Sequence, residues 1–236
     1  MAKPIGNQFG KFNGKLGNKV HRKLYGKQSV SERPPTYNKS MSAGAFKTHM
    51  RTKLNNKLAK AIKSDDILYD LWDKSKSLGA NKNSRILKTN ATITTYEGLN
   101  LHNTITPVYK FVPDKFHPYI HFLKMKSLSL KRKSLIAEFN LSPDIVLFPD
   151  KPLHCVFMVY LSKNDIFTSD DFIVLKFTGD VNINQSDEFM KCKVKVDNES
   201  LELIDSFAKG IIYFAVVRFN DSIKRYEWSN TVSKEI

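Results

Sequence analysis

Cysteine is scarce in this sequence, and long apolar runs are absent. The chain has 236 residues and two cysteines, Cys155 and Cys192, each in an apolar stretch. Two cysteines do not make a disulfide scaffold, so we expect buried, reduced thiols. Residues 1–17 lack the apolar core of a secretory signal, and no run reaches the ~18 apolar residues of a membrane span. The chain is therefore expected in a reducing compartment, or delivered as part of an assembly.

Acidic residues are nearly absent from the first quarter of the chain. Residues 1–63 contain 15 Lys and Arg but one acid, Glu32, a net charge of +14 out of +15 for the whole chain. Residues 64–236 are nearly neutral. A block of charge of one sign repels itself unless something negative lies against it. The asymmetry indicates contact with nucleic acid, another polyanion or an acidic partner; the alternative is a solvated tail.

Recognisable catalytic motifs are also missing. The sequence has no G-x-S-x-G elbow, P-loop, dinucleotide-binding glycine fingerprint or H-E-x-x-H motif. Asp170 and Asp171 are adjacent acids before an apolar stretch, which is more typical of a solvated turn than of catalytic carboxylates. His117 and His121 flank Pro118 in a strand-like stretch, where four residues span ~13 Å, too far for one metal ion. We therefore predict a non-enzymatic protein with no catalytic residue, metal site or cofactor.

Glycine and basic residues alternate through residues 1–40. Five of the ten glycines lie there, so a regular helix is not expected. We interpret this stretch as a basic arm, irregular or folded as a short hairpin, that is ordered by what it touches. Its candidate polyanion-binding residues are Lys11, Lys15, Lys19, Arg22, Lys23, Lys27 and Arg33. Its sparse apolar residues are candidate contacts to a neighbouring subunit in an assembly: Phe9, Phe12, Leu16, Leu24 and Tyr25.

Residues 41–79 have the pattern of a helical segment. Apolar residues recur every four positions from Phe46 to Ile62, and basic residues occupy other positions. Asp65 or Asp66 is expected to cap a following short helix, and Gly79 to end it. The apolar stripe predicts packing onto the rest of the protein, and the alternative is a basic helix that lies on nucleic acid. Opposite faces of one helix allow both.

Residues 80–236 have the pattern of a β-rich body. The predicted strands are Thr92–Tyr96, Thr104–Val112, Tyr119–Lys124, Leu135–Leu141, Leu153–Leu161, Phe172–Phe177, Phe189–Val196, Ile211–Phe219 and Arg225–Ser229. Many short strands separated by turns favour an antiparallel β-sandwich. The predicted fold is thus mainly β: a basic N-terminal arm, a short helical segment, and a β-sandwich or jelly-roll-like body. A second candidate polyanion-binding cluster lies within it, at Lys131, Arg132 and Lys133, and the alternative for it is a charged hairpin.

The arm carries a recurring glycine–lysine pattern. Its residues are Gly10-Lys11-Phe12-Asn13-Gly14-Lys15-Leu16-Gly17-Asn18, then Tyr25-Gly26-Lys27, then Arg33-Pro34. This pattern resembles an uncharacterised family of Bacteroidota and their mobile elements, whose members open with a G-x-x-G-K-x-G-N signature. The resemblance implies an arm, a basic helical segment and a terminal β region, and it implies no activity.

These observations together predict a structural function. We expect a non-enzymatic assembly protein, in its most concrete form a capsid-associated component of a phage virion, whose arm contacts neighbouring subunits or nucleic acid. The alternative is a soluble nucleic-acid-binding protein in the bacterial cytoplasm. The expected partners are other subunits, in a homo- or hetero-oligomer, and nucleic acid.

Overall fold

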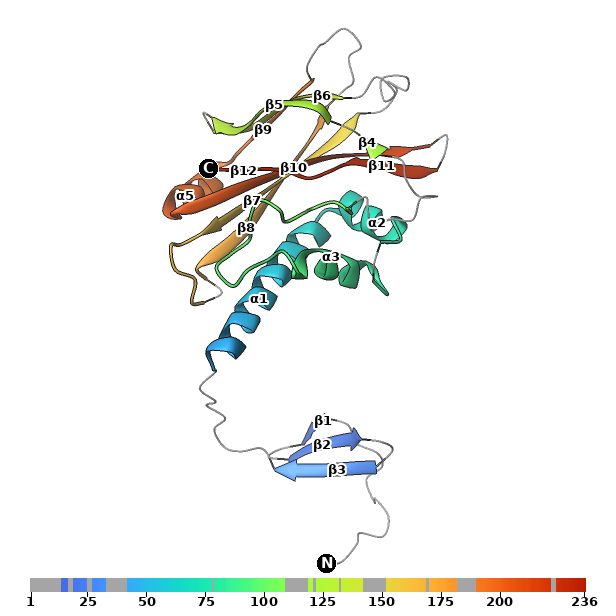
Figure 1. Cartoon of the computed structure of the whole chain (residues 1–236), viewed down its shortest axis with the longest axis vertical. Coiled ribbons are helices and arrows are strands. Elements are labelled where there is room, and N and C mark those ends of the chain that lie inside the picture. The colour runs from blue at the N-terminus through green and yellow to red at the C-terminus, as the bar shows by residue number, and fades with distance from the viewer. Residues whose placement is uncertain are drawn as a thin grey trace, which may run out of the picture. The chain divides into compact units, whose positions relative to one another are not determined.

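The computed structural model (Figure 1) describes residues 14–16, 19–24, 27–32, 42–77, 79–108, 119–120, 122–131, 133–141, 152–168, 170–181, 190–221 and 224–236. The chain divides into two compact units, residues 1–42 and residues 43–236. The predicted helical segment and the predicted β-rich body therefore lie within one compact unit.

The smaller unit contains an antiparallel meander. Its strands are β1 (Gly14–Leu16), β2 (Lys19–Leu24) and β3 (Lys27–Glu32), and they pair in the order β1-β2-β3. Lys23 lies opposite Gln28, and Leu24 lies opposite Lys27. Only two residues separate each strand from the next along the chain. Of the two forms expected for the arm, the hairpin is the one that these strands adopt.

The larger unit is a β-sandwich of two sheets, so the prediction of a mainly β fold is confirmed. The central sheet has the order β4-β11-β10-β7-β8, with β12 also paired to β10, and the small sheet has the order β5-β6-β9. All pairs are antiparallel except β4 with β11. The strands are β4 (Tyr119–Ile120), β5 (Phe122–Lys131), β6 (Ser134–Leu141), β7 (Leu153–Ser162), β8 (Phe172–Val181), β9 (Met190–Lys195), β10 (Lys209–Asn220), β11 (Arg225–Ser229) and β12 (Val232–Glu235).

Helices cover the face of the central sheet that the small sheet leaves open (Figure 1). They are α1 (Ala43–Lys63), α2 (Asp66–Lys74) and α3 (Lys82–Ala91); α5 (Asn198–Ser206) follows β9. Strand β7 serves both layers, because successive side chains of a strand point to opposite faces. Met158 and Tyr160 pack against the helices, whereas Phe157 and Val159 pack against the small sheet. Continuous burial on both faces explains the unbroken apolar runs of β7 and β10.

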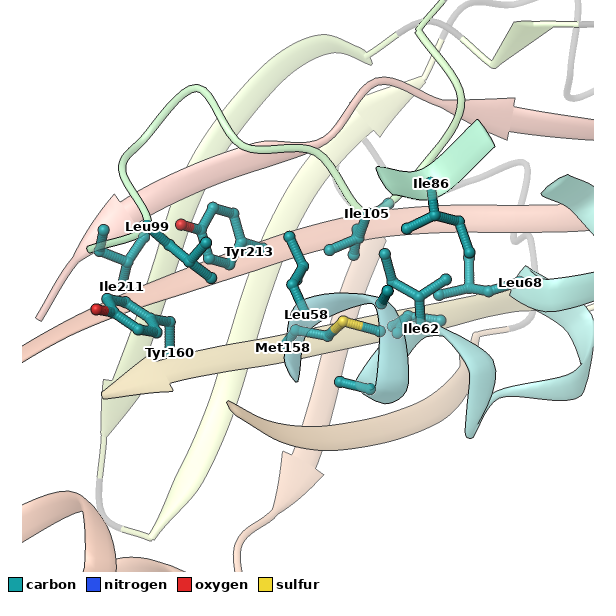
Figure 2. Packing of buried hydrophobic residues seen from close by; sticks show 14 of the residues in the cluster. Leu58, Ile62, Leu68, Ile86, Leu99, Ile105, Met158, Tyr160, Ile211 and Tyr213 are labelled. Atoms are coloured by element: carbon teal, nitrogen blue, oxygen red, sulfur yellow. The ribbon is translucent and has the colours of Figure 1, made fainter. Parts of the chain in front are cut away.

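The apolar stripe of α1 is buried, as its spacing predicted. Met50, Leu54, Leu58 and Ile62 are each at most 1% exposed, and Phe46 packs at the edge of the same cluster. Figure 2 shows Leu58 and Ile62 directed toward Met158 of the central sheet. The stripe therefore anchors α1 to the sheet and leaves the opposite side of the helix to solvent.

Residues 92–108 contain no strand, which corrects the prediction for Thr92–Tyr96 and for the described part of Thr104–Val112. Residues 92–96 and 104–108 are turns and irregular structure, and 109–112 lie outside the described residues. Their threonines donate and accept side-chain hydrogen bonds: Thr94 Oγ1 donates to Asn55 Oδ1 (2.6 Å) and accepts from Asn103 Nδ2 (2.8 Å). Two tryptophan indoles satisfy backbone carbonyls of the same stretch, those of Ile105 and Pro107. Side-chain hydrogen bonds thus take the place of a sheet ladder.

The structure confirms one predicted helix cap, corrects one helix end and adds two helix starts that were not predicted. Asp65 caps α2 as expected, because its Oδ1 accepts from Leu68 N at 2.9 Å. Gly79 is not the C-cap, since α2 ends at Lys74 with Ser75 as its C-cap. Asn81 and Ser84 form a reciprocal capping box that begins the unpredicted α3. Asp197 is the N-cap of the short helix α5, which was not predicted either.

Candidate polyanion-binding surface

Helix α1 contains more basic residues than any other described helix or strand. It contains six basic residues and no acidic one, a net charge of +6: Lys47, Arg51, Lys53, Lys57, Lys60 and Lys63. Much of the charge at the beginning of the sequence therefore belongs to a helix of the larger unit and not to the arm. The helix is held to the sheet by its apolar stripe, so these charges have a rigid support.

The spacing of these charges works against the stability of the helix. Lys47 and Arg51 are four residues apart, as are Lys53 and Lys57, and the pairs Lys57–Lys60 and Lys60–Lys63 are three apart. Like charges at these spacings destabilise a helix by ~0.2–0.5 kcal/mol each, or about 1–2 kcal/mol for the four pairs. Only Lys60 and Lys63, in the last turn, gain from the helix dipole. Selection for stability alone does not favour this pattern.

Two of the six cations are engaged within the protein. The Lys57 amine donates to the carbonyl oxygen of Phe172 at 2.7 Å and lies 4.5 Å from the centroid of its ring. Burial lowers the pKa of Lys57. The Lys47 amine lies 4.4 Å from the centroid of the Tyr96 ring. Lys57 thus fastens α1 to β8, and it is not available to a partner.

Three of the other four cations form what we call the α1 basic face: Lys53, Lys60 and Lys63. Arg51 lies on another side of the helix, because it is nine residues, or about two and a half turns, from Lys60. Arg51 and Lys60 are exposed, and Lys53 and Lys63 are partly exposed. Within the part of the chain that the structure describes, none of the four makes an ion pair. Lys53, Lys60 and Lys63 share one side of the helix by their spacing of seven and three residues. The face is therefore a row of solvated cations with no carboxylate from its own helix among them.

A second basic surface covers the outer side of the small sheet. The strand predicted over Phe189–Val196 is β9, and its side chains alternate: Lys191, Lys193 and Lys195 are exposed, whereas Met190 and Cys192 are buried. Lys126 and Lys131 of β5 and Lys133 of the following turn are also exposed. This surface is partly neutralised, because Lys191 pairs with Glu138 at 2.8 Å and lowers the pKa of that carboxyl. It lies on the opposite side of the central sheet from α1 (Figure 1).

The residues predicted from the sequence are distributed unevenly over these surfaces. Lys131 and Lys133 belong to the small-sheet surface as part of a charged hairpin, and Lys133 donates to Asn198 Oδ1 at 3.1 Å. Arg132 lies outside the described residues. The β9 lysines that join them were not identified, although their strict alternation in the sequence was the available signal. The cations of α1 were noted as a helical pattern but were not assigned as binding residues.

The candidate arm residues are only partly within the described chain. Lys15 and Leu16 belong to β1, Lys19, Arg22, Lys23 and Leu24 to β2, and Lys27 to β3. Lys11, Arg33, Phe9, Phe12 and Tyr25 lie outside the described residues, as do His117 and His121. Their roles in binding polyanions or neighbouring subunits stay predictions.

One cluster of titratable side chains resembles a catalytic arrangement at first sight. His154 Nε2 lies 3.1 Å from Asp65 Oδ2, and His154 Nδ1 lies 3.2 Å from Asp180 Oδ1. Burial lowers the pKa of His154, but the hydrogen bonds and charges of the two carboxylates outweigh it and raise the pKa overall. Both ring nitrogens are therefore occupied by carboxylates. No nitrogen is left to accept a proton from a nucleophile, so the cluster joins α2 to the sheet.

The adjacent acids Asp170 and Asp171 lie in the connection between β7 and β8, as predicted for a turn. Asp171 accepts from Lys163 Nζ, and it also accepts from the backbone and hydroxyl of Thr168 and the backbone of Phe167. These donors, led by Lys163, hold the pKa of Asp171 well below its usual range. Among the residues that the structure describes, no group of His, Cys, Asp and Glu has the arrangement of a metal site.

Cys155 and Cys192 are both buried and unpaired by a disulfide, as expected. Among the described helices, none is long and apolar enough to cross a membrane.

No protein-family model matches the chain, and no curated protein matches it in sequence. The resemblance of the arm to a Bacteroidota family therefore stays a prediction.

Proposed function

We propose that this chain is a non-enzymatic protein that binds the phosphate backbone of nucleic acid through the α1 basic face and the basic arm. The observation that carries the proposal is the composition of α1: a helix packed against the core whose solvated cations have no acidic neighbour in the same helix. Lysine and arginine on a rigid helix make contacts to phosphates that do not depend on sequence.

The charge distribution favours a phosphate backbone over a compact acidic partner. Lys53 and Lys63 are ten residues apart, which is about 15 Å along a helix at 1.5 Å per residue. Double-stranded DNA carries one negative charge per ~1.7 Å of axis, so a straight row of cations meets several phosphates. The small-sheet surface supports the proposal less, because Glu138 already neutralises part of it.

The proposal is tested by the salt dependence of binding to a DNA duplex. Each phosphate contact contributes a slope of about −0.9 to the plot of log K against log salt, so the three cations of the α1 basic face contribute about −2.7. Replacing Lys53, Lys60 and Lys63 with Gln should reduce the slope by about that amount. Six cations of the arm should contribute about −5, which replacement of Lys11, Lys15, Lys19, Arg22, Lys23 and Lys27 with Gln should remove.

A matched control separates local contact from general loss of charge. Lys209 and Lys234 are exposed near the end of the central sheet, away from α1. The double variant Lys209→Gln, Lys234→Gln should leave the slope unchanged. A slope that is unaffected by the α1 variant shows that α1 does not contact phosphates. A slope that survives both the α1 and the arm variants contradicts the proposal as a whole.

The second candidate is a structural component of a multi-subunit assembly, such as a phage virion. The division into a small unit of residues 1–42 and a larger unit with its own core supports it. Apolar arm residues would be buried against a neighbouring subunit, and the arm would become ordered on assembly. Mass spectrometry of native particles should then find the protein, and hydrogen exchange should show stronger protection of the arm in particles than in the free chain. A protein found only as a free monomer or dimer contradicts this candidate.

A further inference from the structure

The two cysteines of the chain belong to different sheets and meet in the core between them. Cys155 lies on β7 of the central sheet, Cys192 lies on β9 of the small sheet, and both side chains are buried in the same hydrophobic cluster. The two thiols share a hydrogen bond. That contact and burial raise the pKa of Cys155 well above its ordinary value, so its thiol is protonated at neutral pH.

A glycine of the central sheet makes room for this contact. Cys155 lies directly opposite Gly179 of β8, and residues opposite each other in an antiparallel pair have Cβ positions ~4.5–5.5 Å apart. A Cβ added at Gly179 would lie 3.7 Å from Cys192 Sγ and 2.8 Å from Val194 Cγ2. The missing side chain therefore lets β9 approach the central sheet at the place where the two sulfurs meet.

The position of β9 provides a route by which a reagent reaches the buried thiols. Strand β9 is at one edge of the small sheet, and among the described strands of that sheet it pairs only with β6. An edge strand is held by a single ladder, so it opens more readily than a central one. Strand β7, in contrast, is paired with β8 on one side and β10 on the other. Local opening of β9 thus exposes Cys192 first and Cys155 behind it, while β7 stays in place.

We propose that Cys155 and Cys192 are a redox pair, which a small-molecule disulfide such as oxidised glutathione converts to a disulfide between the two sheets. Cys192 loses its proton to solvent and attacks the small disulfide, which forms a mixed disulfide and releases one small thiol. Cys155 then loses its proton and attacks the Cys192 sulfur, which forms the protein disulfide and releases the second small thiol. Two cysteine thiols are oxidised, and one small disulfide is reduced to two thiols.

The bond links the edge strand of the small sheet to the centre of the central sheet. It closes a loop from residue 155 to residue 192, and such a cross-link stabilises a fold mainly by restricting the unfolded chain. In a reducing compartment the pair stays open, and in an oxidising one it closes and fixes β9. The pair includes no residue of the α1 basic face, so this inference is independent of binding to nucleic acid.

The test exposes full-length protein to a mixture of reduced and oxidised glutathione, both in the native state and during refolding from urea. Both preparations should lose their two titratable thiols, and the intact mass should fall by two hydrogens with no attached glutathione. A digest without reductant should contain the peptide of Cys155 linked to that of Cys192. The native protein should react more slowly, because β9 must open first.

Stability and three variants serve as further readouts. The unfolding equilibrium constant of the oxidised protein should be at least about thirtyfold lower than that of the reduced protein, and dithiothreitol should reverse the change. Cys155→Ala and Cys192→Ala should form no internal link and gain no stability in the same mixture. Gly179→Ala retains both thiols but holds the sheets apart, so its equilibrium ratio of disulfide to dithiol should be at least tenfold lower.

Three results would overturn the inference. The first is a refolded protein that keeps both thiols in the oxidising mixture. The second is glutathione that stays attached to Cys192 or Cys155 without closure, because the sulfurs are then not in reach of each other. The third is a linked protein that is no more stable than the reduced one. The α1 variant should close to the same extent as wild type, so failure of this inference is distinguishable from failure of the proposed function.

Discussion

The contact between Asp65 and His154 makes a quantitative prediction about stability. Asp65 is 5% exposed and has two roles: Oδ1 caps α2, and Oδ2 lies 3.1 Å from His154 Nε2 of β7. Lys176 Nζ approaches the same carboxylate at 3.8 Å. Burial raises the pKa of Asp65, but the hydrogen bonds from His154 and Leu68 and the nearby cations outweigh it, so the pKa lies below its ordinary value.

Asp65→Asn separates the two roles. Asparagine retains an oxygen for the N-cap but removes the charge that His154 contacts. A hydrogen bond to a charged group contributes about 1.5–3 kcal/mol, so the variant should lose about 2 kcal/mol of unfolding free energy at pH 5.5. Asp65→Ala should lose about 1 kcal/mol more, because it also removes the cap.

The loss should depend on pH in a defined direction. The pKa of His154 is raised above 6.5 in the folded chain, so its stabilisation is complete below pH 6.5 and disappears as pH rises through the folded value. The pKa of Asp65 is lowered below 3.8, so its stabilisation is present above pH 3.8 and disappears as pH falls through the folded value. The difference between wild type and Asp65→Asn should therefore be largest between pH 3.8 and pH 6.5.

Urea unfolding of the two proteins at pH 5.5 and pH 8.5 measures this difference. Asp66→Asn is the matched control, since it changes an exposed carboxylate in the first turn of the same helix and should cost less than about 0.5 kcal/mol. The double variant with His154→Gln should cost less than the sum of the single variants. An equal loss at both pH values, or additive losses, would refute the coupling.

Three other predictions concern folding and the core. Residues 43–236 without the arm should unfold cooperatively, because both hydrophobic clusters lie within them, and a truncated chain that fails to fold would make the arm part of the core. Cys155 and Cys192 should resist thiol labelling in the native protein and react as two thiols after unfolding without reductant; a count of zero would indicate a disulfide. Phe214→Ala should reduce the unfolding free energy by about 4 kcal/mol in denaturant titrations, because its ring joins Phe139 of the small sheet to Phe157 of the central sheet, whereas a loss under 1 kcal/mol would contradict this packing.

Local patterns predicted the elements whose burial is uniform. The four-residue spacing of Leu54, Leu58 and Ile62 identified α1, because every apolar residue of the stripe meets the same sheet. The strands β6, β7 and β10 were identified from their apolar residues, most of which are buried. Asp65 was recognised as a cap because the requirement for an acceptor at the beginning of a helix is local.

Predictions failed where a distant partner decides the local structure. Thr94 and Thr104 favour a strand by propensity, but hydrogen bonds to Asn55 and Asn90 hold this stretch in an irregular conformation. Helix α3 contains few apolar residues, and its buried face includes Arg85, whose guanidinium donates to the carbonyl oxygens of Trp72 and Asp73. A polar face that is satisfied by tertiary hydrogen bonds has no apolar periodicity to detect.

Local patterns were enough to predict a mainly β protein with positive charge concentrated toward one end, because burial periodicity and charge can be followed residue by residue along the chain. Contacts between distant segments determine that Lys57 is held by Phe172 and that Lys193 and Lys131 share one sheet. Tertiary packing alone brought Cys155 of β7 to Cys192 of β9. Such sites depend on contacts between segments far apart in sequence, and a pattern along the chain carries no information on which strands meet in space.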